Sequence, residues 1–298
     1  MKIKSLGEFG LIKRLQKKIR LNSSVVIGSG DDCAVLKQDK LNYQLFTCDM
    51  ICAGVDFKKT DDLKLVGRKA LAISISDIAA CGGVPQHAVA SFGIPKNFRV
   101  RQIDLLSQGL FDLANDFKIN IVGGDISLAP ELVIDLSLLG QVEKRKLCLR
   151  RGAKVNDIIL VTGDFGGSLL GKHLKFTPRL KEARYLVNHY KINSMIDVSD
   201  GLVQDLGHIL EHSAVGGIIY EVLVPLNKDA RNVKAAMSAG EDFELLFTAS
   251  REEARKIIKC SKYCFRAIGE IMPQKFGLRI TDAAGGLRKT KIGGYRHF

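Results

Sequence analysis

Acidic residues recur in this chain beside glycine or at the ends of strand-like and helix-like runs. The motifs GSGDD, TCD, ISD, GGD, IDVSDG and GED carry them, at Asp32, Asp49, Asp77, Asp125, Asp197, Asp200, Glu241 and Asp242. Two carboxylates ~4 Å apart repel by about 1 kcal/mol in water and by about 4 kcal/mol at an effective dielectric constant of ~20. A cluster of them is therefore expected to hold divalent cations, and Mg²⁺ is the oxygen-seeking ion usually shared with phosphates. Separate turn and N-cap roles for the individual Asp residues are the alternative.

Strand and helix patterns alternate along the chain and would position these motifs. In the first half we expect strands over residues 44–48, 88–94, 119–122 and 132–139, and helices over 61–80 and 100–117. In the second half we expect strands over 158–162, 217–222, 243–248 and 265–271. A glycine turn and helices should follow the first of these strands, and a further helix should follow IDVSDG and end near residue 211.

A basic, polar stretch over residues 143–157 separates the two halves. We therefore predict two domains, over residues 1–143 and 144–298. Several neighbouring strands lack a helix between them, which favours an α+β class with two α/β domains over a doubly wound parallel sheet.

Composition excludes several classes of protein. Of the 298 residues, 46% are hydrophobic and 26% are charged, as in a folded soluble protein. No run of ~18 apolar residues predicts a membrane span. The first twenty residues lack the apolar run of a signal peptide and predict an amphipathic helix with Phe9, Ile12, Leu15 and Ile19 on one face. Seven cysteines without a CxxC pair indicate reduced thiols of a cytoplasmic protein and no zinc site.

Two further patterns could mislead. The net charge of +13 would suit a nucleic-acid-binding protein, but Lys and Arg are scattered, Trp is absent and no recognised motif appears. We expect no nucleic-acid partner. Residues 166–172, GGSLLGK, match the start of a phosphate-binding P-loop, but His173 stands where Ser or Thr is needed.

Read in order, the motifs resemble the thiamine-monophosphate kinases, within the superfamily of aminoimidazole ribonucleotide synthetase. The matching segments are residues 7–12, 28–36, 48–57, 69–85, 123–127, 149–157, 161–168, 196–209 and 239–248 and the terminal GGYRHF. The opening GEF and the closing GYRHF separate this family from its relatives. A cysteine-bearing tail, for example, would mark the hydrogenase-maturation relative.

The resemblance implies a fold, a reaction and partners. The fold is aminoimidazole ribonucleotide synthetase-like. Its N-terminal domains bind ATP and metal and pair their sheets as a barrel in a homodimer, and its C-terminal domain closes the active cleft. The reaction transfers the γ-phosphoryl group of ATP directly to thiamine monophosphate, with several Mg²⁺ ions, giving thiamine diphosphate.

The resemblance also implies residue roles. The metal-binding positions are Asp32, Thr47, Cys48, Asp49, Asp77, Asp125, Asp197 and Asp200. ATP contacts are implied for Gly124, Asp125, Arg150 and Ser199, and thiamine-phosphate contacts for Asp56, Glu241 and Tyr295. Cys48 replaces a hydroxyl residue and Asp56 stands where some relatives have His. A backbone carbonyl ligand would tolerate Cys48, whereas a side-chain ligand would not.

The chemistry of the residues agrees with this reaction. Transfer between phosphates needs positioning and charge neutralisation. The acceptor oxygen is already deprotonated at neutral pH, so we expect no catalytic base and no phosphoenzyme. A superfamily relative that acts on another substrate is the competing hypothesis. It would keep the ATP and metal residues but not the roles of Asp56, Glu241 and Tyr295.

Overall fold

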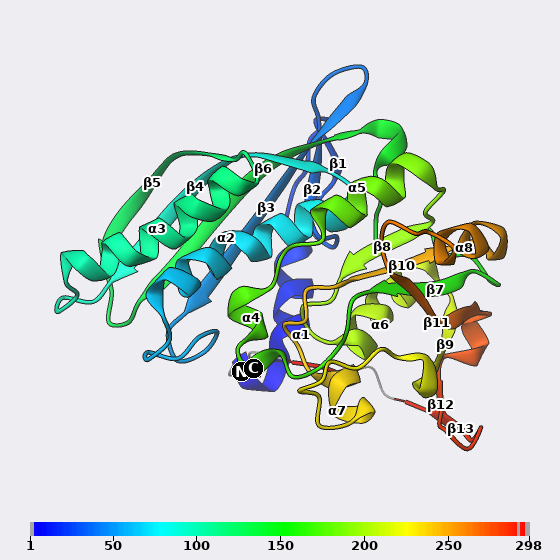
Figure 1. Cartoon of the computed structure of the whole chain (residues 1–298). Helices are drawn as coiled ribbons and strands as arrows, with labels where there is room; N and C mark the ends of the chain where they lie inside the picture. Colours follow the sequence, from blue (N-terminus) through cyan, green and yellow to red (C-terminus); the bar gives the residue numbers. More distant parts are fainter. Residues whose placement is uncertain (1–2, 291–292, 296–298) are drawn as a thin grey trace.

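The computed structural model describes residues 3–290 and 293–295, which form two β-sheets with helices packed against them (Figure 1). The first sheet has six strands in the order β1-β2-β3-β6-β4-β5. Adjacent strands in this sheet are antiparallel, except for β4 and β5, which are parallel. The strands are β1 (Val25–Ile27), β2 (Ala34–Lys37), β3 (Asn42–Cys52), β4 (Val84–Ile94), β5 (Asn120–Leu128) and β6 (Val133–Glu143).

Two helices, α2 (Leu63–Ala80) and α3 (Val100–Asp116), cover one face of this sheet (Figure 1). The side chain of Asp62 caps α2 by accepting a hydrogen bond from the backbone N–H of Lys64 at 2.9 Å. The two helices approach closely through glycines. A Cβ atom on Gly109 would lie 1.7 Å from the carbonyl oxygen of Lys64, and one on Gly67 would lie 1.9 Å from that of Leu106.

The opposite face of the first sheet stays open to solvent. Along β3, Leu45, Thr47 and Ile51 are buried, whereas Phe46 and Met50 are 42% and 60% exposed. This alternation follows from the two-residue period of a strand. An open face that carries large apolar side chains is rare on a monomer surface.

The second sheet has seven strands in the order β13-β12-β9-β11-β7-β10-β8. Adjacent strands in this sheet are antiparallel, except for β9 and β12, which are parallel. The strands are β7 (Ile158–Thr162), β8 (Ser194–Asp197), β9 (Gly216–Tyr220), β10 (Leu245–Ala249), β11 (Phe265–Met272), β12 (Leu278–Thr281) and β13 (Leu287–Lys289). The helices of this half are α4 (Lys172–Lys175), α5 (Leu180–His189), α6 (Leu202–Ser213), α7 (Val233–Ser238) and α8 (Arg251–Ile258).

The two halves are in direct contact. Helix α2 touches α4, α5 and β8, and the stacked rings of Phe176 and Phe243, 4.2 Å apart, pack into the core beneath the first sheet. None of the described helices is both long and apolar enough to cross a bilayer.

The N-terminal helix α1 (Ile3–Gln16) lies beside α6 of the second half (Figure 1). The rings of Phe9 and His208 are 5.5 Å apart, and Lys13 forms an ion pair of 3.3 Å with Glu211. The predicted helix is confirmed, but it ends at Gln16, so Ile19 falls outside it. Gly7, with φ 68°, interrupts the helical backbone.

The fold confirms the α+β prediction. Each strand and helix predicted above is present, with shifted ends. The helices expected between the strand over 158–162 and the IDVSDG turn correspond to α4 and α5, whereas the prediction missed β1, β2, β8, β12, β13, α7 and α8.

Candidate active site

Three of the predicted acidic residues converge between the two halves of the chain. Asp32 precedes β2, Asp77 lies near the end of α2, and Asp197 ends β8. One carboxylate oxygen from each lies within 4.8 Å of the other two. Asp32 and Asp197 are buried, and Asp77 is half-buried. These three residues, called the carboxylate group below, therefore come from three parts of the chain that are far apart in the sequence.

Burial and mutual repulsion disfavour the charged forms of these residues. Burial, opposed in part by a hydrogen bond from Ser74, raises the pKa of Asp49 to about 6 from 3.8. Burial and the nearby Asp32 raise the pKa of Asp197 to about 7. Burial and the charges of Asp49, Asp197 and Asp32 raise the pKa of Asp77 well above its usual value. At neutral pH the group needs protons or cations to be stable.

Hydroxyl side chains orient the carboxylates. Ser76 donates a hydrogen bond to Oδ2 of Asp197, and Ser74 donates to Oδ2 of Asp49, each at 2.6 Å. Thr47 donates to Oδ2 of Asp77. Both serines lie on α2 in the segment ISISD. Sequence reasoning did not select them, although two hydroxyls in an otherwise apolar helix segment were a visible signal.

Arg150 holds Asp32. Its Nε and Nη2 atoms donate to Oδ1 of Asp32 at 3.1 and 2.6 Å, and its backbone N–H faces the carboxylate of Asp31 at 3.2 Å. Oδ2 of Asp32 is buried and has no hydrogen-bond partner among the residues that the structure describes. An unpaired buried carboxylate oxygen beside further carboxylates suits a hard cation, because Mg²⁺ prefers such all-oxygen ligands. The residues present therefore fit this metal.

The side chain of Cys48 points away from the carboxylate group. It lies on the open face of β3, where its thiol contacts Oδ1 of Asp135 at 3.2 Å. Thr47 and Asp49 point to the opposite face because side chains alternate along a strand. Only the backbone of Cys48 is left for the contact that the resemblance implied.

Asp200 sits in a neighbouring cluster. Carboxylate oxygens of Asp200 and Asp205 and a ring nitrogen of His208 lie within 4.8 Å of one another. Gln204 donates to Oδ2 of Asp200 at 2.8 Å. Asp205 accepts from the backbone N–H groups of Asp200 and Gly201 at 3.0 Å, which fixes the turn before α6. Ser199 lies in the same turn, beside Asp200.

Gly124 and Asp125 lie on the edge strand β5, away from the carboxylate group. Asp49 pairs with Leu136, Leu136 with Ala90, and Ala90 with Gly124. Three strand spacings of ~4.8 Å put Gly124 about 14 Å from Asp49 across the sheet. A Cβ atom at Gly124 would lie 1.8 Å from the carbonyl oxygen of Ala90, which explains the glycine.

The three predicted thiamine-phosphate residues come together, around a lysine that sequence reasoning missed. Lys69 of α2 forms an ion pair with Oε1 of Glu241 at 2.5 Å and donates to the carbonyl oxygen of Asp56 at 2.7 Å. Burial and the charges of Asp56 and Glu241 raise the pKa of Tyr295. Its backbone N–H donates to the carbonyl oxygen of Asp200 at 3.0 Å.

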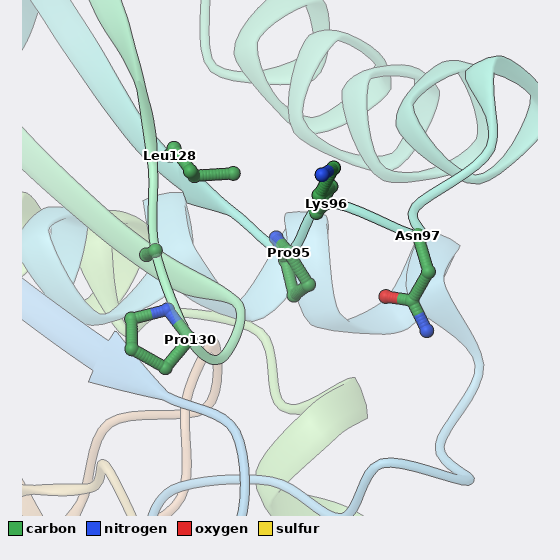
Figure 2. Close-up of a pocket in the computed structure, with 6 residues that line it drawn as sticks. Pro95, Lys96, Asn97, Leu128 and Pro130 are labelled. Carbon is green, nitrogen blue, oxygen red and sulfur yellow. The ribbon is translucent and has the colours of Figure 1, made fainter.

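Two cavities adjoin these residues. One, of about 570 Å³, lies between α1 and α6, and Arg150, Ser199 and Asp200 reach it. The other, of about 640 Å³, lies between α3 and β5, where Phe111 faces Gly124 and Asp125. A third hollow of about 560 Å³ lies between the turns that carry Pro95 and Pro130 (Figure 2). Its described lining includes no Asp, Glu, His or Cys, so it offers no comparable chemistry.

The segment that matched a P-loop has another role. Lys172 donates to the carbonyl oxygen of Asp164 at 2.8 Å and lies 3.3 Å from Oε1 of the buried Glu244. The lysine is thus held by the protein itself. It anchors the segment before β10, which carries Glu241, Asp242 and Glu244.

Family models match both halves of the chain. Residues 30–142 match the AIR synthase related protein N-terminal domain, and residues 151–280 match the corresponding C-terminal domain. The fold and site therefore define an AIR synthase related protein. A hydrogenase maturation protein HypE of Escherichia coli shares the fold alone, at 17% identity and a TM-score of 0.74.

Individual proteins that are similar to this chain identify its family within this class. The chain is 32% identical to a thiamine-monophosphate kinase of Buchnera aphidicola over 98% of this chain and 99% of that protein. It is 33% identical to one of Bacillus subtilis over 83% of this chain and 85% of that protein. A solved structure described as AaThiL complexed with AMPPCP and TMP has a TM-score of 0.88 and 28% identity, covering 100% and 99% of the two chains. The chain belongs to the thiamine-monophosphate kinase family. Membership makes it an ATP-dependent phosphotransferase of thiamine biosynthesis.

Proposed function

We propose that this chain transfers the γ-phosphoryl group of ATP to the phosphate of thiamine monophosphate at the carboxylate group, with Mg²⁺ bound there. The observation that carries the proposal is the convergence of Asp32, Asp77 and Asp197, with a buried oxygen of Asp32 unpaired among the described residues. Asp49, Asp200 and the backbone of Thr47 and Cys48 complete the proposed ligand set. Asp125 stands in register with Ser91, Asp135 and Met50, so its side chain lies on the open face of the sheet, and its implied metal contact does not follow from this arrangement. Bound Mg²⁺ supplies positive charge to the phosphate oxygens.

The resemblance implied nucleotide contacts at Gly124, Asp125, Arg150 and Ser199, and two of the cavities adjoin these residues. We place the adenine in the cavity between α3 and β5, because this cavity is largely apolar and adjoins Gly124 and Asp125. Arg150 and Ser199 reach the other cavity, between α1 and α6, and would contact the phosphates from there.

The chain's own residues do the positioning. Arg150 has five N–H donors in a planar fork, so it can bind phosphate oxygens while it holds Asp32. Asp56, Glu241 and Tyr295 hold the acceptor. The acceptor oxygen needs no base, and the carboxylates have the neighbours of ligands rather than those of an activated nucleophile. We therefore propose direct transfer without a phosphoenzyme.

We further propose that two copies pair through the open face of the first sheet. Phe46 and Met50 of β3 and Val89 of β4 lie on this face and are 42%, 60% and 40% exposed. Register places Val89 and Cys48 opposite the same residue, Ser137, so these side chains share one face. A second copy would cover the patch. The seven free thiols suit a reducing compartment, and we place the protein in the cytoplasm.

The test is an assay of the purified protein with thiamine monophosphate, ATP and Mg²⁺, read as thiamine diphosphate formed. The wild type should form product, and removal of the divalent cation by a chelator should stop the reaction. Asp77→Asn should lose at least ~10³-fold in kcat, because it removes a negative charge from the carboxylates that would hold Mg²⁺. Cys48→Ala is the matched control and should keep its activity within about threefold, since its thiol faces away. Product formed at the wild-type rate by Asp77→Asn would contradict the proposed site.

A further inference from the structure

Lys69 is an unusual residue for the interior of a protein. It is among the largest fully buried side chains of the described residues, with 1% of its surface exposed. A buried ammonium group is costly unless it is paired and hydrogen-bonded. Its two acceptors are Oε1 of Glu241, at 2.5 Å, and the carbonyl oxygen of Asp56, at 2.7 Å.

These two acceptors come from opposite halves of the chain. Asp56 lies in the turn after β3, and its own carboxylate closes that turn by accepting from the backbone N–H of Cys52 at 2.7 Å. Glu241 lies in the loop before β10 of the second sheet. The ammonium group of Lys69 therefore fixes the distance between the two segments that the proposed acceptor site requires.

The backbone at Glu241 is strained. Glu241 and Phe243 have φ of 65° and 51°, in the left-handed region that residues other than glycine rarely adopt. The backbone N–H of Glu241 donates to the carbonyl oxygen of Ser199 at 2.6 Å, which helps to hold this conformation. Strained residues of this kind concentrate at functional sites, where the surrounding structure keeps them in place.

The two carboxylate oxygens of Glu241 have different surroundings. Oε1 accepts from Lys69, whereas Oε2 is buried and has no hydrogen-bond partner among the described residues. A buried oxygen of this kind needs a donor, because leaving it unpaired costs free energy. Tyr295 lies close enough for the charge of Glu241 to raise its pKa. An acceptor molecule beside Tyr295 would therefore be within reach of Oε2.

We infer that Lys69 is a positioning residue for the phosphate acceptor: it holds Oε1 of Glu241 so that Oε2 accepts a hydrogen bond from an N–H group of that acceptor. This inference rests on the proposed function. Because the pair of Lys69 and Glu241 carries no net charge, it offers little attraction to the cationic thiazolium ring. The donor that fits Oε2 is instead the amino group of the aminopyrimidine ring.

The first experiment measures KM for thiamine monophosphate and for ATP in Lys69→Met, Glu241→Gln and the double variant. Each single change should raise the acceptor KM ~10- to 100-fold, the loss expected for a hydrogen bond to a charged group. The ATP KM should stay within about twofold. The double variant should resemble Glu241→Gln alone, since Lys69 acts through Glu241.

Stability is measured on the same variants. Lys69→Met leaves the carboxylate of Glu241 without its cation and should lower Tm, whereas the double variant removes both charges and should recover part of that loss. The double variant thus keeps the test valid if the single variant folds poorly. Lys64→Met is the matched control on α2. Its exposed ion pair with Asp112, at 2.7 Å, should matter little to Tm or to either KM.

The second experiment uses an acceptor analogue in which oxygen replaces the pyrimidine amino group. The wild type should bind it ~10- to 100-fold more weakly than thiamine monophosphate, and Glu241→Gln should reduce this difference. Equal binding of the two acceptors by the wild type would overturn the assignment to the amino group. Parallel changes in both KM values, or additive effects in the double variant, would overturn the role of Lys69. An unchanged acceptor KM in Glu241→Gln would instead refute the proposed acceptor site itself.

Discussion

At the scale of single residues, the site is built from carboxylates whose charged forms are disfavoured. Asp49 and Asp197 have pKa values raised to about 6 and about 7, from 3.8. Between pH 4 and pH 7 these two carboxyl groups therefore bind more protons in the folded protein than in the unfolded chain. By linkage, their contribution to the free energy of unfolding falls as the pH rises through this range.

This predicts an inverted pH profile for the metal-free protein. With a chelator present, Tm should fall between pH 5 and pH 7.5, as protons leave the group. With Mg²⁺ at millimolar concentration the fall should be smaller, because the cation binds the deprotonated form. Thermal melts at several pH values, with and without Mg²⁺, provide the measurement. A Tm that rises steadily over this range without the cation would contradict the raised pKa values.

The acidic residues of the site were predictable from the sequence because they stand beside glycine or at the ends of strand-like and helix-like runs. Lys69 was not, since it occurs within KALAIS, an otherwise apolar helix segment, and its acceptors are Asp56 and the distant Glu241. The orientation of Cys48 depends on strand register, which the sequence of one strand does not define. It became clear only from the pairing of β3 with β6.

At the scale of elements, helix α2 carries the site. It presents Ser74, Ser76 and Asp77 to the carboxylate group and Lys69 to Glu241. Its position depends on α3, which packs against it where Gly109 meets the backbone of Lys64. Gly67 and Gly109 thus allow α2 and α3 to pack closely.

Gly109→Ala is therefore expected to be destabilising, although alanine favours a helix. The added methyl group would lie 1.7 Å from a backbone oxygen, so one helix must shift. Overpacking of this kind costs ~1–3 kcal/mol of unfolding free energy. Denaturant titration measures it, with Gly123→Ala on β5 as a control, where a methyl group meets no atom within 4 Å. Equal stability of the two variants would contradict the tight helix contact.

Helices and strands were predicted correctly where their apolar residues recur at a clear helical or strand spacing. Helix α3 has apolar residues at helical spacing, and β6 has the alternating burial of a half-exposed strand. The strands β1, β12 and β13 have only 3, 4 and 3 residues, too few for a period to be recognised. Helix α8 is amphipathic but short and highly charged, so its buried residues, Ala254 and Ile257, gave little signal.

At the scale of the whole molecule, the open face of the first sheet predicts self-association. Met50→Lys would put a charge at the centre of the proposed dimer interface and should weaken it by at least ~2 kcal/mol, about thirtyfold in Kd. Light scattering across a dilution series measures the change. Val100→Lys, at a residue 78% exposed at the start of α3, should leave the dimer intact. A wild-type protein that is monomeric at all concentrations would refute the proposal.

The docking of α1 on α6 sets an order of events during synthesis. The ion pair of Lys13 and Glu211 joins residues 198 positions apart. At ~5–20 residues per second, the ribosome makes the first helix roughly 10–40 s before its partner. Contacts of such long range also slow folding, because the chain must close a large loop before they form. The first helix to be made is therefore among the last to reach its place, and the cavity beside Arg150 is completed only after most of the chain has left the ribosome.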